Sequence, residues 1–402
     1  MKQPKPRHPV VPRPVRGPTG PDEWRLLHEL RAHPEIFDRI AATTGAELHR
    51  QQELRREFPD DLVRAALRLH ELRQAARGKF ARADAMWFDP VGLEQATAGP
   101  IAIHKAARFS GRVRDECCGI GGDALALARS CEVVAIDLDP AACLRTRWNA
   151  EVNGVGGSVH PLCADVETLP AGEGLLHIDP DRRAEGTRTR RVEQYRPALE
   201  FLRERMRSFD GGAVKIGPAD NFAGKFPEAE IELISLHGEC KEATVWFGAL
   251  AGDLPRRATA LPAGETLVGD PLDAAAPIDE LGAYLFDPDP AVVRAGLVDL
   301  LAEQHGLRRL DAEEEYLTGD APVPTALARA FAVRAELPNN EREIRNYFRR
   351  EPCGEVEIKC RHIPIVAERV RRKLPREGTG RATLVFARIG GRARAVVCRR
   401  VE

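Results

Sequence analysis

Apolar residues recur every three or four positions from residue 22 to about residue 80, which is the spacing of one buried face of a helix. The apolar positions of this pattern are Trp24, Leu26, Leu27, Leu30, Leu62, Ala65, Ala66, Leu69 and Leu72. The spacing predicts a helical N-terminal domain over residues 21–98. This stretch carries no motif with a chemistry of its own, so its expected task is packing.

From about residue 112 the pattern changes to short apolar runs that alternate with helical stretches. Strands are expected at 113–117, 132–136, 175–178, 212–216, 230–236 and 244–247, and helices at 124–130 and 141–153. Strands that alternate with helices predict an α/β fold, a mostly parallel, Rossmann-like doubly wound sheet over residues 99–252. The last two strands have the spacing of a hairpin, which would put an antiparallel strand at the edge of the sheet.

The rest of the chain reads as smaller α+β segments. Residues 255–275 are rich in Pro, Gly and Ala and are expected to form a linker, so residues 253–330 are interpreted as a linker and a small α+β segment. Residues 331–402 are expected to form a separate α+β domain. Its strands are expected at 331–336, 355–360 and 382–388, and its helix at 341–350.

Composition and charge narrow the class of protein. The chain has 402 residues, 43% of them hydrophobic, and a net charge of −1, which is enough for two or three domains. No apolar run approaches the ~20 residues that cross a bilayer. Residues 1–20 are basic and proline-rich, and they lack the apolar stretch of a secretory signal. They are expected to form a disordered tail. Nine cysteines without a C-x-x-C pair argue against a metal site and favour a reducing, cytoplasmic location.

The charge is concentrated at the C-terminal end. Residues 331–402 contain 18 Lys and Arg against nine Asp and Glu, a net charge of +9. A basic domain suggests an acidic partner such as RNA, and the alternative is a solvated arginine-rich surface.

A glycine-rich turn follows the strand at 113–117. Cys117 precedes Gly119-x-Gly121, and Asp123 begins the expected helix. Glycines let the backbone approach a ligand closely, and the N-terminus of the helix offers free N–H groups, so the pattern predicts a nucleotide-binding turn. Alone, it fits a dinucleotide as well.

Acidic residues at three successive strand ends favour S-adenosylmethionine over a dinucleotide. Asp115 is placed to receive the ammonium of a methionine moiety, whereas it would repel a pyrophosphate. Asp137, followed by Leu138, is placed to accept hydrogen bonds from the ribose hydroxyls, and Asp165 from the adenine amino group. A dinucleotide site and a silent site that binds no cofactor remain the alternatives.

These residues also carry a family resemblance. The block from Asp115 to Asp123, with Ala135–Pro140 and Asn149-Ala150, resembles class I methyltransferases, above all those related to trimethylguanosine synthase, the RNA cap guanine-N2 enzymes. Upstream, Gly92–Thr97 and His104–Ala106 resemble a bacterial subgroup with a C-terminal THUMP-like domain, and the resemblance covers most of residues 80–402. It implies that Gln95 and Thr97 close over the cofactor, and that the C-terminal domain binds RNA.

The resemblance also indicates where methyl transfer occurs. In enzymes that methylate exocyclic amines, Asn, Asp or Ser followed by two prolines and an aromatic residue stands at the end of the strand at 175–178. Here the residues are Asp179, Pro180, Asp181 and Arg182. Asp179 and the Pro180 carbonyl are expected to accept the two amine hydrogens.

Asp181 and Arg182 depart from that pattern, so stacking on a base must come from another group. A guanidinium plane of Arg182 or Arg183 and an aromatic ring such as Tyr195 or Phe222 are the alternatives. The leading hypothesis is methylation of a base amino group in tRNA or rRNA. The alternatives are a methyltransferase that acts on DNA, protein or a small molecule, and an RNA-binding protein with a silent cofactor fold.

Overall fold

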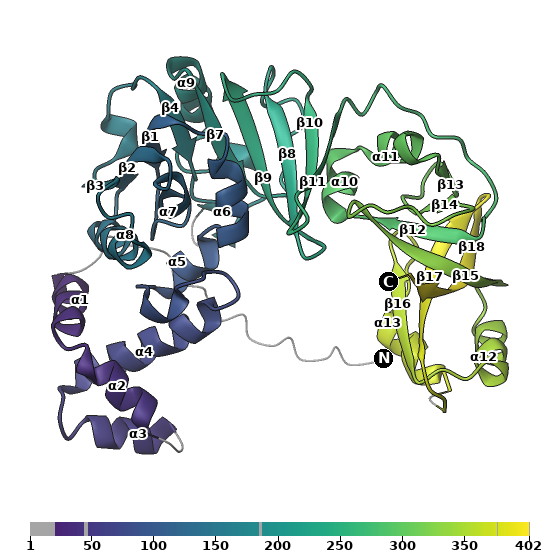
Figure 1. Ribbon diagram of the computed structural model, residues 1–402, viewed down its shortest axis with the longest axis horizontal. Coiled ribbons are helices and arrows are strands. Elements are labelled where there is room, and N and C mark those ends of the chain that lie inside the picture. The colour runs from purple at the N-terminus through teal and green to yellow at the C-terminus, as the bar shows by residue number, and fades with distance from the viewer. Residues whose placement is uncertain (1–20, 44–46, 185–186, 376, 402) are drawn as a thin grey trace, which may run out of the picture. The chain divides into compact units, whose positions relative to one another are not determined.

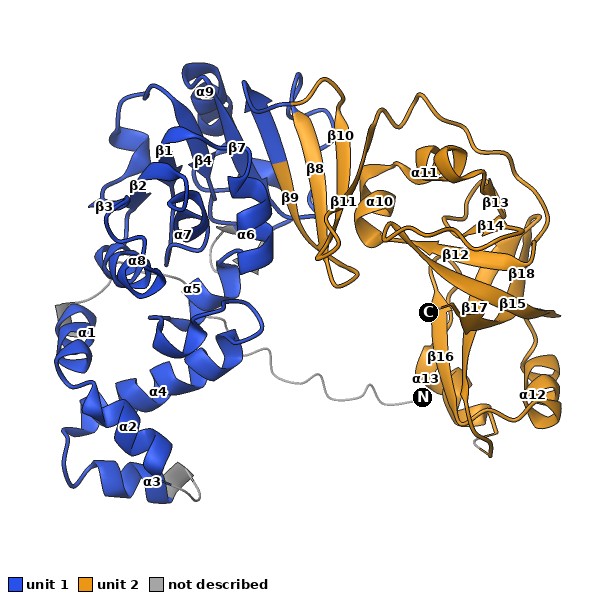
Figure 2. Cartoon of the chain, viewed as in Figure 1, with its two compact units in different colours: residues 1–229, 245–251 blue, residues 230–244, 252–402 orange. Residues whose placement is uncertain are grey.

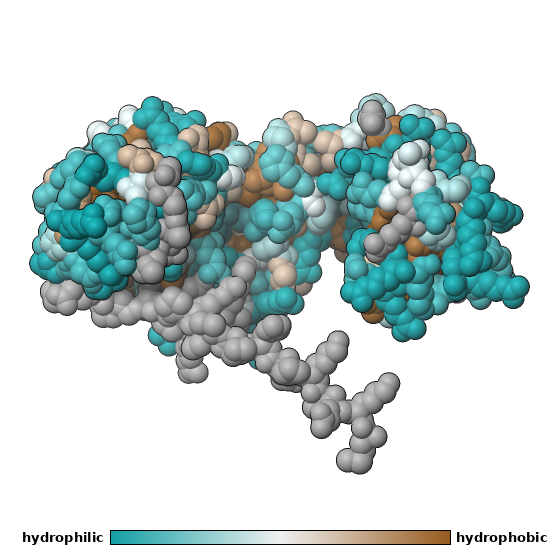
Figure 3. All heavy atoms as spheres, turned by 90° about the horizontal axis from the view of Figure 1, so that it is seen from below, coloured by the Kyte–Doolittle hydropathy of each residue, from teal (hydrophilic) through white to brown (hydrophobic). Residues whose placement is uncertain are grey.

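The computed structural model describes residues 21–43, 47–184, 187–375 and 377–401 (Figure 1). The expected basic tail, residues 1–20, lies outside the described residues. The chain divides into two compact units: unit 1 is Met1–Ala229 with Val245–Ala251, and unit 2 is Glu230–Thr244 with Gly252–Glu402 (Figure 2). Among the described residues, no helix is long and apolar enough to cross a membrane, and hydrophilic side chains cover most of the face seen in Figure 3.

The expected N-terminal helices are present in unit 1. They are α1 (Pro21–Ala32), α2 (Glu35–Ala42), α3 (Glu47–Leu54) and α4 (Asp60–Ala76). Leu27, Leu30 and Leu62 are buried, as the apolar spacing predicts, and belong to the same hydrophobic cluster as Val133 and Trp148 of the α/β part. The hydrophobic core of the helices is therefore continuous with that of the sheet.

A nine-stranded sheet with the order β11-β10-β8-β9-β7-β4-β1-β2-β3 confirms the α/β fold class. Its strands are β1 (Gly111–Glu116), β2 (Cys131–Asp137), β3 (Val159–Cys163), β4 (Leu175–Ile178), β7 (Gly211–Ile216), β8 (Glu230–Leu236), β9 (Glu239–Gly248), β10 (Arg256–Leu261) and β11 (Glu265–Gly269). The pairs β1–β2, β2–β3, β1–β4, β4–β7 and β8–β10 are parallel. From β1, the chain continues outward through β2 and β3 on one side and through β4 and β7 on the other, so the order reverses between β1 and β4.

Short helices accompany these strands in unit 1. They are η1 (Ala83–Ala85), α5 (Pro90–Gln95), α6 (Gly99–Ala106), α7 (Ala124–Leu127), α8 (Pro140–Asn153), η2 (Val166–Thr168), η3 (Val192–Gln194) and α9 (Leu199–Ser208), and β5 (Arg183–Ala184) pairs with β6 (Thr187–Arg188). Local sequence fixes both ends of α8: the Asp139 carboxylate accepts the N–H of Ala141, Pro140 occupies the first turn, and Gly154 ends the helix at φ 76°.

Asn149 of α8 joins three segments of the chain. Its side-chain oxygen accepts the N–H of Trp87 (2.7 Å), and its amide group donates to the carbonyls of Trp87 and Ile120 (both 3.0 Å). The side chain is completely buried. It therefore holds the segment before α5 and the glycine-rich turn against α8.

Replacement of Asn149 by alanine is expected to lower the free energy of unfolding by roughly 3 kcal/mol, because one buried donor and two buried acceptors lose their partner. Chemical denaturation monitored by tryptophan fluorescence measures the change. Asn153→Ala, one turn further along α8 and half-buried, is the matched control, with an expected loss below about 1 kcal/mol. Equal losses in the two variants would contradict this role of Asn149.

Two strands stand where a linker was expected. Residues 255–275 contain β10 and β11, so the hairpin strands β8 and β9 are neighbours inside the sheet and β11 forms its edge. The buried positions of β10 are the small residues Ala258, Thr259 and Ala260. Small side chains contribute little to a hydropathy pattern, and flanking Pro and Gly residues resemble a linker.

The C-terminal part of unit 2 forms a seven-stranded sheet in the order β13-β14-β12-β15-β18-β17-β16. Its elements are β12 (Tyr284–Pro288), α10 (Pro290–Ala295), α11 (Val298–His305), β13 (Arg308–Arg309), β14 (Leu317–Gly319), β15 (Ala328–Pro338), α12 (Glu341–Arg350), β16 (Glu355–Cys360), α13 (Ala367–Lys373), β17 (Arg381–Ile389) and β18 (Arg392–Arg400). Because β12 pairs with β15, one sheet joins the segments expected at 253–330 and 331–402. The strand β18 was not expected, since arginines flank its short apolar run.

Candidate active site

A cavity of about 810 Å³ lies beside the strand ends of the α/β part. The carboxyl ends of β1, β2, β3 and β4 contribute the residues that follow them, and in doubly wound sheets ligands bind where the strand order reverses. The lining residues are Gly92, Gln95, Ala96, Cys117, Cys118, Gly119, Ile120, Asp137, Leu138, Asp139, Ala164, Asp165, Val166, Glu167, Asp179, Pro180, Asp181, Arg182, Arg196 and Pro197.

Ten of the fourteen site residues expected from sequence line this cavity. They are Gln95, Cys117, Gly119, Asp137, Leu138, Asp165, Asp179, Pro180, Asp181 and Arg182. The other four do not belong to the lining: Thr97, Asp115, Gly121 and Asp123. Residues that follow four strands, far apart along the chain, thus line a single cavity.

The turn between β1 and α7 needs glycine for steric reasons. Gly119 has φ 57° and Gly121 φ 89°, and a Cβ on Gly121 would lie 3.1 Å from the Thr146 side chain. Thr146 also donates its hydroxyl to the Gly119 carbonyl (2.9 Å). The turn is therefore held close to α8, and its backbone faces the cavity at Gly119.

Asp137, at the end of β2, has a carboxylate of fixed orientation. One oxygen accepts the N–H of Gly119 (2.8 Å) and the other the N–H of Asp139 (2.9 Å). Two backbone donors keep the side chain in one rotamer beside the turn. Since each carboxylate oxygen can accept more than one hydrogen bond, this group suits a vicinal diol such as a ribose.

Asp165 and Leu138 both line the cavity, each directly after a strand. The Asp165 carboxylate caps η2 by accepting the N–H of Glu167 (2.9 Å), which fixes its position after β3. The Leu138 side chain is 69% exposed although it is large and apolar. An exposed leucine together with a carboxylate suits an adenine ring, which has an apolar face and an amino group at its edge.

The four residues outside the lining lie beneath it, and three of them join a buried polar network. Thr97 donates its hydroxyl to Asp123 (2.6 Å), whose other oxygen pairs with the ammonium of Lys105 (2.8 Å). The Lys105 ammonium lies 3.3 Å from His177 Nε2, and His177 Nδ1 lies 2.6 Å from Asp115 Oδ1. The second oxygen of Asp115 is buried without a hydrogen bond. This network joins the segment after α5 to β1, β4 and α7.

Charges within the network compensate one another. Burial raises the pKa of the Asp115 carboxyl, and the nearby His177 offsets only part of this effect. Burial opposes ionisation of Asp123, but the attraction of Lys105, and then of His177, holds the pKa of this carboxyl well below its usual range. Burial lowers the pKa of His177. The attraction of Asp123 and Asp115 raises this pKa by more than burial lowers it, so the net shift is upward. Lys105 and His177 had no role in the prediction from sequence.

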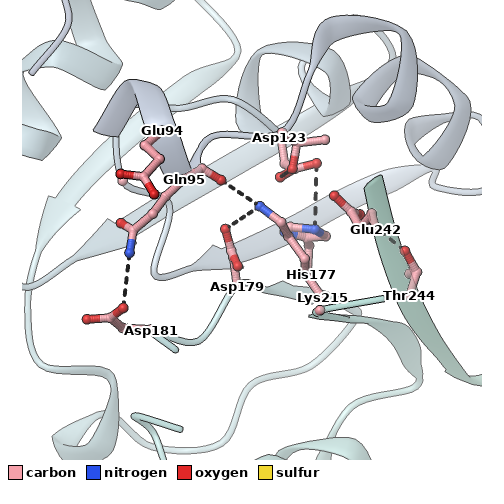
Figure 4. Close-up of polar contacts among 12 residues, drawn as sticks. Glu94, Gln95, Asp123, His177, Asp179, Asp181, Lys215, Glu242 and Thr244 are labelled. Atoms are coloured by element: carbon pink, nitrogen blue, oxygen red, sulfur yellow. Dashed lines mark hydrogen bonds and ion pairs between the residues drawn. The ribbon is translucent and has the colours of Figure 1, made fainter. Parts of the chain in front are cut away.

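The expected transfer site, Asp179, is paired with a residue that the sequence did not single out. Lys215 of β7 donates to the Asp179 carboxylate (2.7 Å) and to the Gln95 carbonyl (3.0 Å) (Figure 4). The Lys215 side chain is 5% exposed and that of Asp179 is 23% exposed. A lysine within a fully buried strand was the only signal in the sequence that could have identified it.

The segment from Asp179 to Arg182 is held on both sides. The Gln95 side-chain amide donates to Asp181 (3.0 Å), as Figure 4 shows. The backbone of Asp181 exchanges two hydrogen bonds with Arg196 (2.7 and 3.0 Å). The end of α5 therefore contacts the expected acceptor segment directly.

The structure decides which groups are available to stack on an acceptor. Tyr195 and Phe222 are buried, and the Tyr195 hydroxyl donates to Asp220. Neither lines the cavity, and no other aromatic residue in the described chain does so. Arg182 and Arg196 are among the residues that line the cavity, and they carry the guanidinium groups that remain as candidates for stacking. The side chains of Arg183 and Arg188 fall outside the described residues.

The charge of the cavity discriminates between the two cofactor classes. Six of its lining residues are acidic (Asp137, Asp139, Asp165, Glu167, Asp179 and Asp181), and two are arginines. A pyrophosphate would be repelled by this excess of carboxylates, whereas a cationic sulfonium nucleoside is attracted. The donor set thus fits S-adenosylmethionine.

In unit 2, many basic side chains are exposed. On α12 and α13 they include Arg342, Arg349, Arg350, Arg369, Arg371, Arg372 and Lys373. Unit 2 also holds one group of potential metal ligands within the described chain, Glu314, Glu315 and His362. The Glu314 carboxylate already accepts the backbone N–H groups of Arg388 (2.8 Å) and Glu315 (3.0 Å), so the fold accounts for its burial.

Comparisons with known proteins agree with this geometry. A family model described as RNA cap guanine-N2 methyltransferase matches residues 110–204, and one described as THUMP domain-like matches residues 328–400. A crystal structure from Porphyromonas gingivalis W83, assigned to the methyltransferases without an established activity, shares the fold with a TM-score of 0.75 at 18% identity. That likeness covers 94% of this chain and 99% of the other.

Curated relatives are more similar in sequence. Uncharacterized S-adenosylmethionine-dependent methyltransferases of two Mycobacterium tuberculosis strains, CDC 1551 / Oshkosh and ATCC 25618 / H37Rv, are each 37% identical over 345 residues. The match covers 82% of this chain and 94% of each relative. With the cavity and its donor set, it shows that the chain belongs to the S-adenosylmethionine-dependent methyltransferases and carries a THUMP-like domain at its C-terminal end.

Proposed function

We propose that this enzyme methylates an exocyclic amino group of a base in RNA, with tRNA or rRNA as the substrate. The observation that carries the proposal is the Asp179 carboxylate at the cavity, followed directly by the Pro180 carbonyl. An exocyclic amine has two N–H groups, and these two oxygens are neighbouring acceptors for them. Oδ1 of Asp179 makes no hydrogen bond to any described residue, so it is available to a substrate.

The RNA part of the proposal draws on the basic domain and on the comparisons. Residues 331–402 carry a net charge of +9, which suits a phosphate backbone. The family model that matches residues 110–204 is described as an RNA cap guanine-N2 methyltransferase. The family model that matches residues 328–400 is described as THUMP domain-like. The nine cysteines are free, as a reducing compartment keeps them, which supports a cytoplasmic enzyme acting where RNA is abundant.

Each group of the cavity has a part in this reaction. S-adenosylmethionine supplies an electrophilic methyl group. Asp137 holds the ribose, and Asp165 and Leu138 hold the adenine. Asp179 and the Pro180 carbonyl orient the amine so that its nitrogen lone pair faces the methyl group, because alignment provides most of the acceleration of such a displacement.

Incubation of the purified protein with methyl-labelled S-adenosylmethionine and total RNA from a strain that lacks the gene tests the proposal. Label is expected in the RNA fraction, and ribonuclease is expected to release it as a modified nucleotide. DNA from the same strain is the control. Absence of label from RNA, while the cofactor binds, would contradict the proposal.

A second candidate function has one observation in its favour. No aromatic residue lines the cavity in the described chain, whereas two arginines do. An acceptor that is not a base, in a protein or in a small molecule, does not require an aromatic stacking partner. With a whole-cell extract of the same strain as substrate, this alternative predicts label in a fraction that ribonuclease does not release.

A further inference from the structure

The pair formed by Asp179 and Lys215 is unusual in its environment. Lys215 lies in β7, whose six residues are all buried, and its ammonium has two acceptors, Asp179 Oδ2 and the Gln95 carbonyl. A buried ammonium is costly unless it is paired and hydrogen-bonded. The nearest carboxylate to this ammonium is that of Asp179, which follows β4 and lines the cavity, although the Lys215 charge also acts on the buried Asp123 carboxylate.

The ion pair changes what Asp179 presents to a substrate. A carboxylate alone carries a full negative charge, and it would lie in the same cavity as a cationic cofactor. When the Lys215 ammonium donates to Asp179 Oδ2, the two side chains together carry no net charge. The other carboxylate oxygen, Oδ1, can still accept a hydrogen bond. In this respect the pair is chemically similar to an asparagine amide, one of the three residue types expected here from the resemblance: a neutral group with one oxygen directed at the amine.

We infer that Lys215 is a positioning residue, which turns Asp179 into a neutral hydrogen-bond acceptor of fixed orientation for the amine. The inference rests on the proposed function and specifies how its acceptor site operates. Lys215 contacts neither cofactor nor substrate in this role. It holds Oδ2 so that the carboxylate cannot rotate toward the cofactor, and its second bond, to the Gln95 carbonyl, fixes the distance between Asp179 and the end of α5.

Four variants of the full chain test the inference: Lys215→Met, Lys215→Arg, Asp179→Asn and the double variant Asp179→Asn with Lys215→Met. In Lys215→Met the carboxylate regains its full charge and loses its fixed orientation. We expect kcat for RNA methylation to fall by about 10- to 100-fold, with affinity for S-adenosylhomocysteine no weaker than in the wild type. Lys215→Arg keeps the charge and is expected to stay within about 10-fold of the wild type.

The double variant gives the sharpest result. Its amide at position 179 is again a neutral acceptor, and position 215 holds no buried charge, so we expect its kcat to exceed that of either single variant by about 10-fold. Two independent effects would instead multiply, and the double variant would be the least active of the three. Lys241→Met is the matched control: Lys241 pairs with Glu239 at the surface, 42% exposed, and wild-type kcat is expected.

Each outcome decides one question. Wild-type kcat in Lys215→Met overturns the inference, as does a double variant less active than both single ones. Loss of cofactor binding and of thermal stability in parallel with kcat, unrelieved in the double variant, would show a purely structural role and also overturns it. Failure of the wild-type protein itself to label RNA is a different result, because it contradicts the proposed function and not the pairing.

Discussion

Replacement of Asp179 by alanine is expected to reduce kcat for RNA methylation by at least about 100-fold. In the proposed reaction the variant loses the side-chain oxygen that orients the amine, and loss of one such preorganised group typically costs about 10²–10³ in rate. It also leaves the Lys215 ammonium without its carboxylate in a buried site. The rate of label transfer to RNA at saturating cofactor measures the effect.

Cofactor binding separates this effect from misfolding. Affinity for S-adenosylhomocysteine, measured by calorimetry, is expected to stay within about threefold of the wild type, because Asp179 does not hold the nucleoside. Asp210→Ala is the matched control. Asp210 directly precedes β7, at the amino end of the strand, whereas the cavity lies at the carboxyl ends of the parallel strands. Its exposed side chain accepts the N–H of Gly174 (3.2 Å). A comparable loss of kcat in Asp210→Ala, or none in Asp179→Ala, would remove Asp179 from the transfer site.

Replacement of Asp137 by alanine is expected to act on binding instead. The dissociation constant of S-adenosylhomocysteine should rise by roughly 100-fold or more, which corresponds to about 3 kcal/mol. The variant removes the proposed acceptor of the ribose hydroxyls, and it releases the N–H groups of Gly119 and Asp139, which fix the glycine-rich turn. Isothermal titration calorimetry measures the change directly.

Glu132→Ala is the matched control for Asp137. Glu132 lies on the same strand, β2, but near its amino end, where its exposed carboxylate contacts His160 (3.0 Å). Its removal is expected to leave cofactor affinity unchanged within about twofold. If Asp137→Ala binds S-adenosylhomocysteine as tightly as the wild type, the ribose must be held elsewhere and the orientation of the cofactor in the cavity must be revised.

Taken together, the two aspartate variants separate the acceptor from the cofactor. Asp179→Ala should lower kcat with little change in cofactor affinity, and Asp137→Ala should raise the dissociation constant of the cofactor. Both side chains lie at carboxyl ends of parallel strands of one sheet and line one cavity. Any function that places the acceptor outside this cavity would not produce this division.

Local sequence determined several elements of both units. Strand β4 has the bounds expected from its apolar run, Leu175–Ile178, and α12 those expected from its pattern, Glu341–Arg350. Asp137 and Asp179 could be placed at strand ends because a strand and the turn after it are specified by adjacent residues. The carboxyl ends of parallel strands necessarily meet at one edge of the sheet, so a shared cavity followed from the fold class.

Only the tertiary structure decided what surrounds those residues. Lys215 lies 36 residues from Asp179 along the chain, Lys105 lies 72 residues from His177, and Gln95 lies 86 residues from Asp181. Such pairs depend on which strands become neighbours and on which face each side chain points, and neither leaves a local pattern. The same holds for Tyr195, an aromatic residue near the expected acceptor segment that the fold buries away from the cavity.

The sequence by itself thus determined the α/β fold class, the glycine-rich turn after β1 and the carboxylates at the strand ends, because residues a few positions apart specify each of them. The tertiary structure decided that β10 and β11 complete the sheet, that one sheet joins β12 to β15, and that Lys215 pairs with Asp179. These features arise from pairings between distant segments. Their free energy comes from contacts that exist only once the chain has folded.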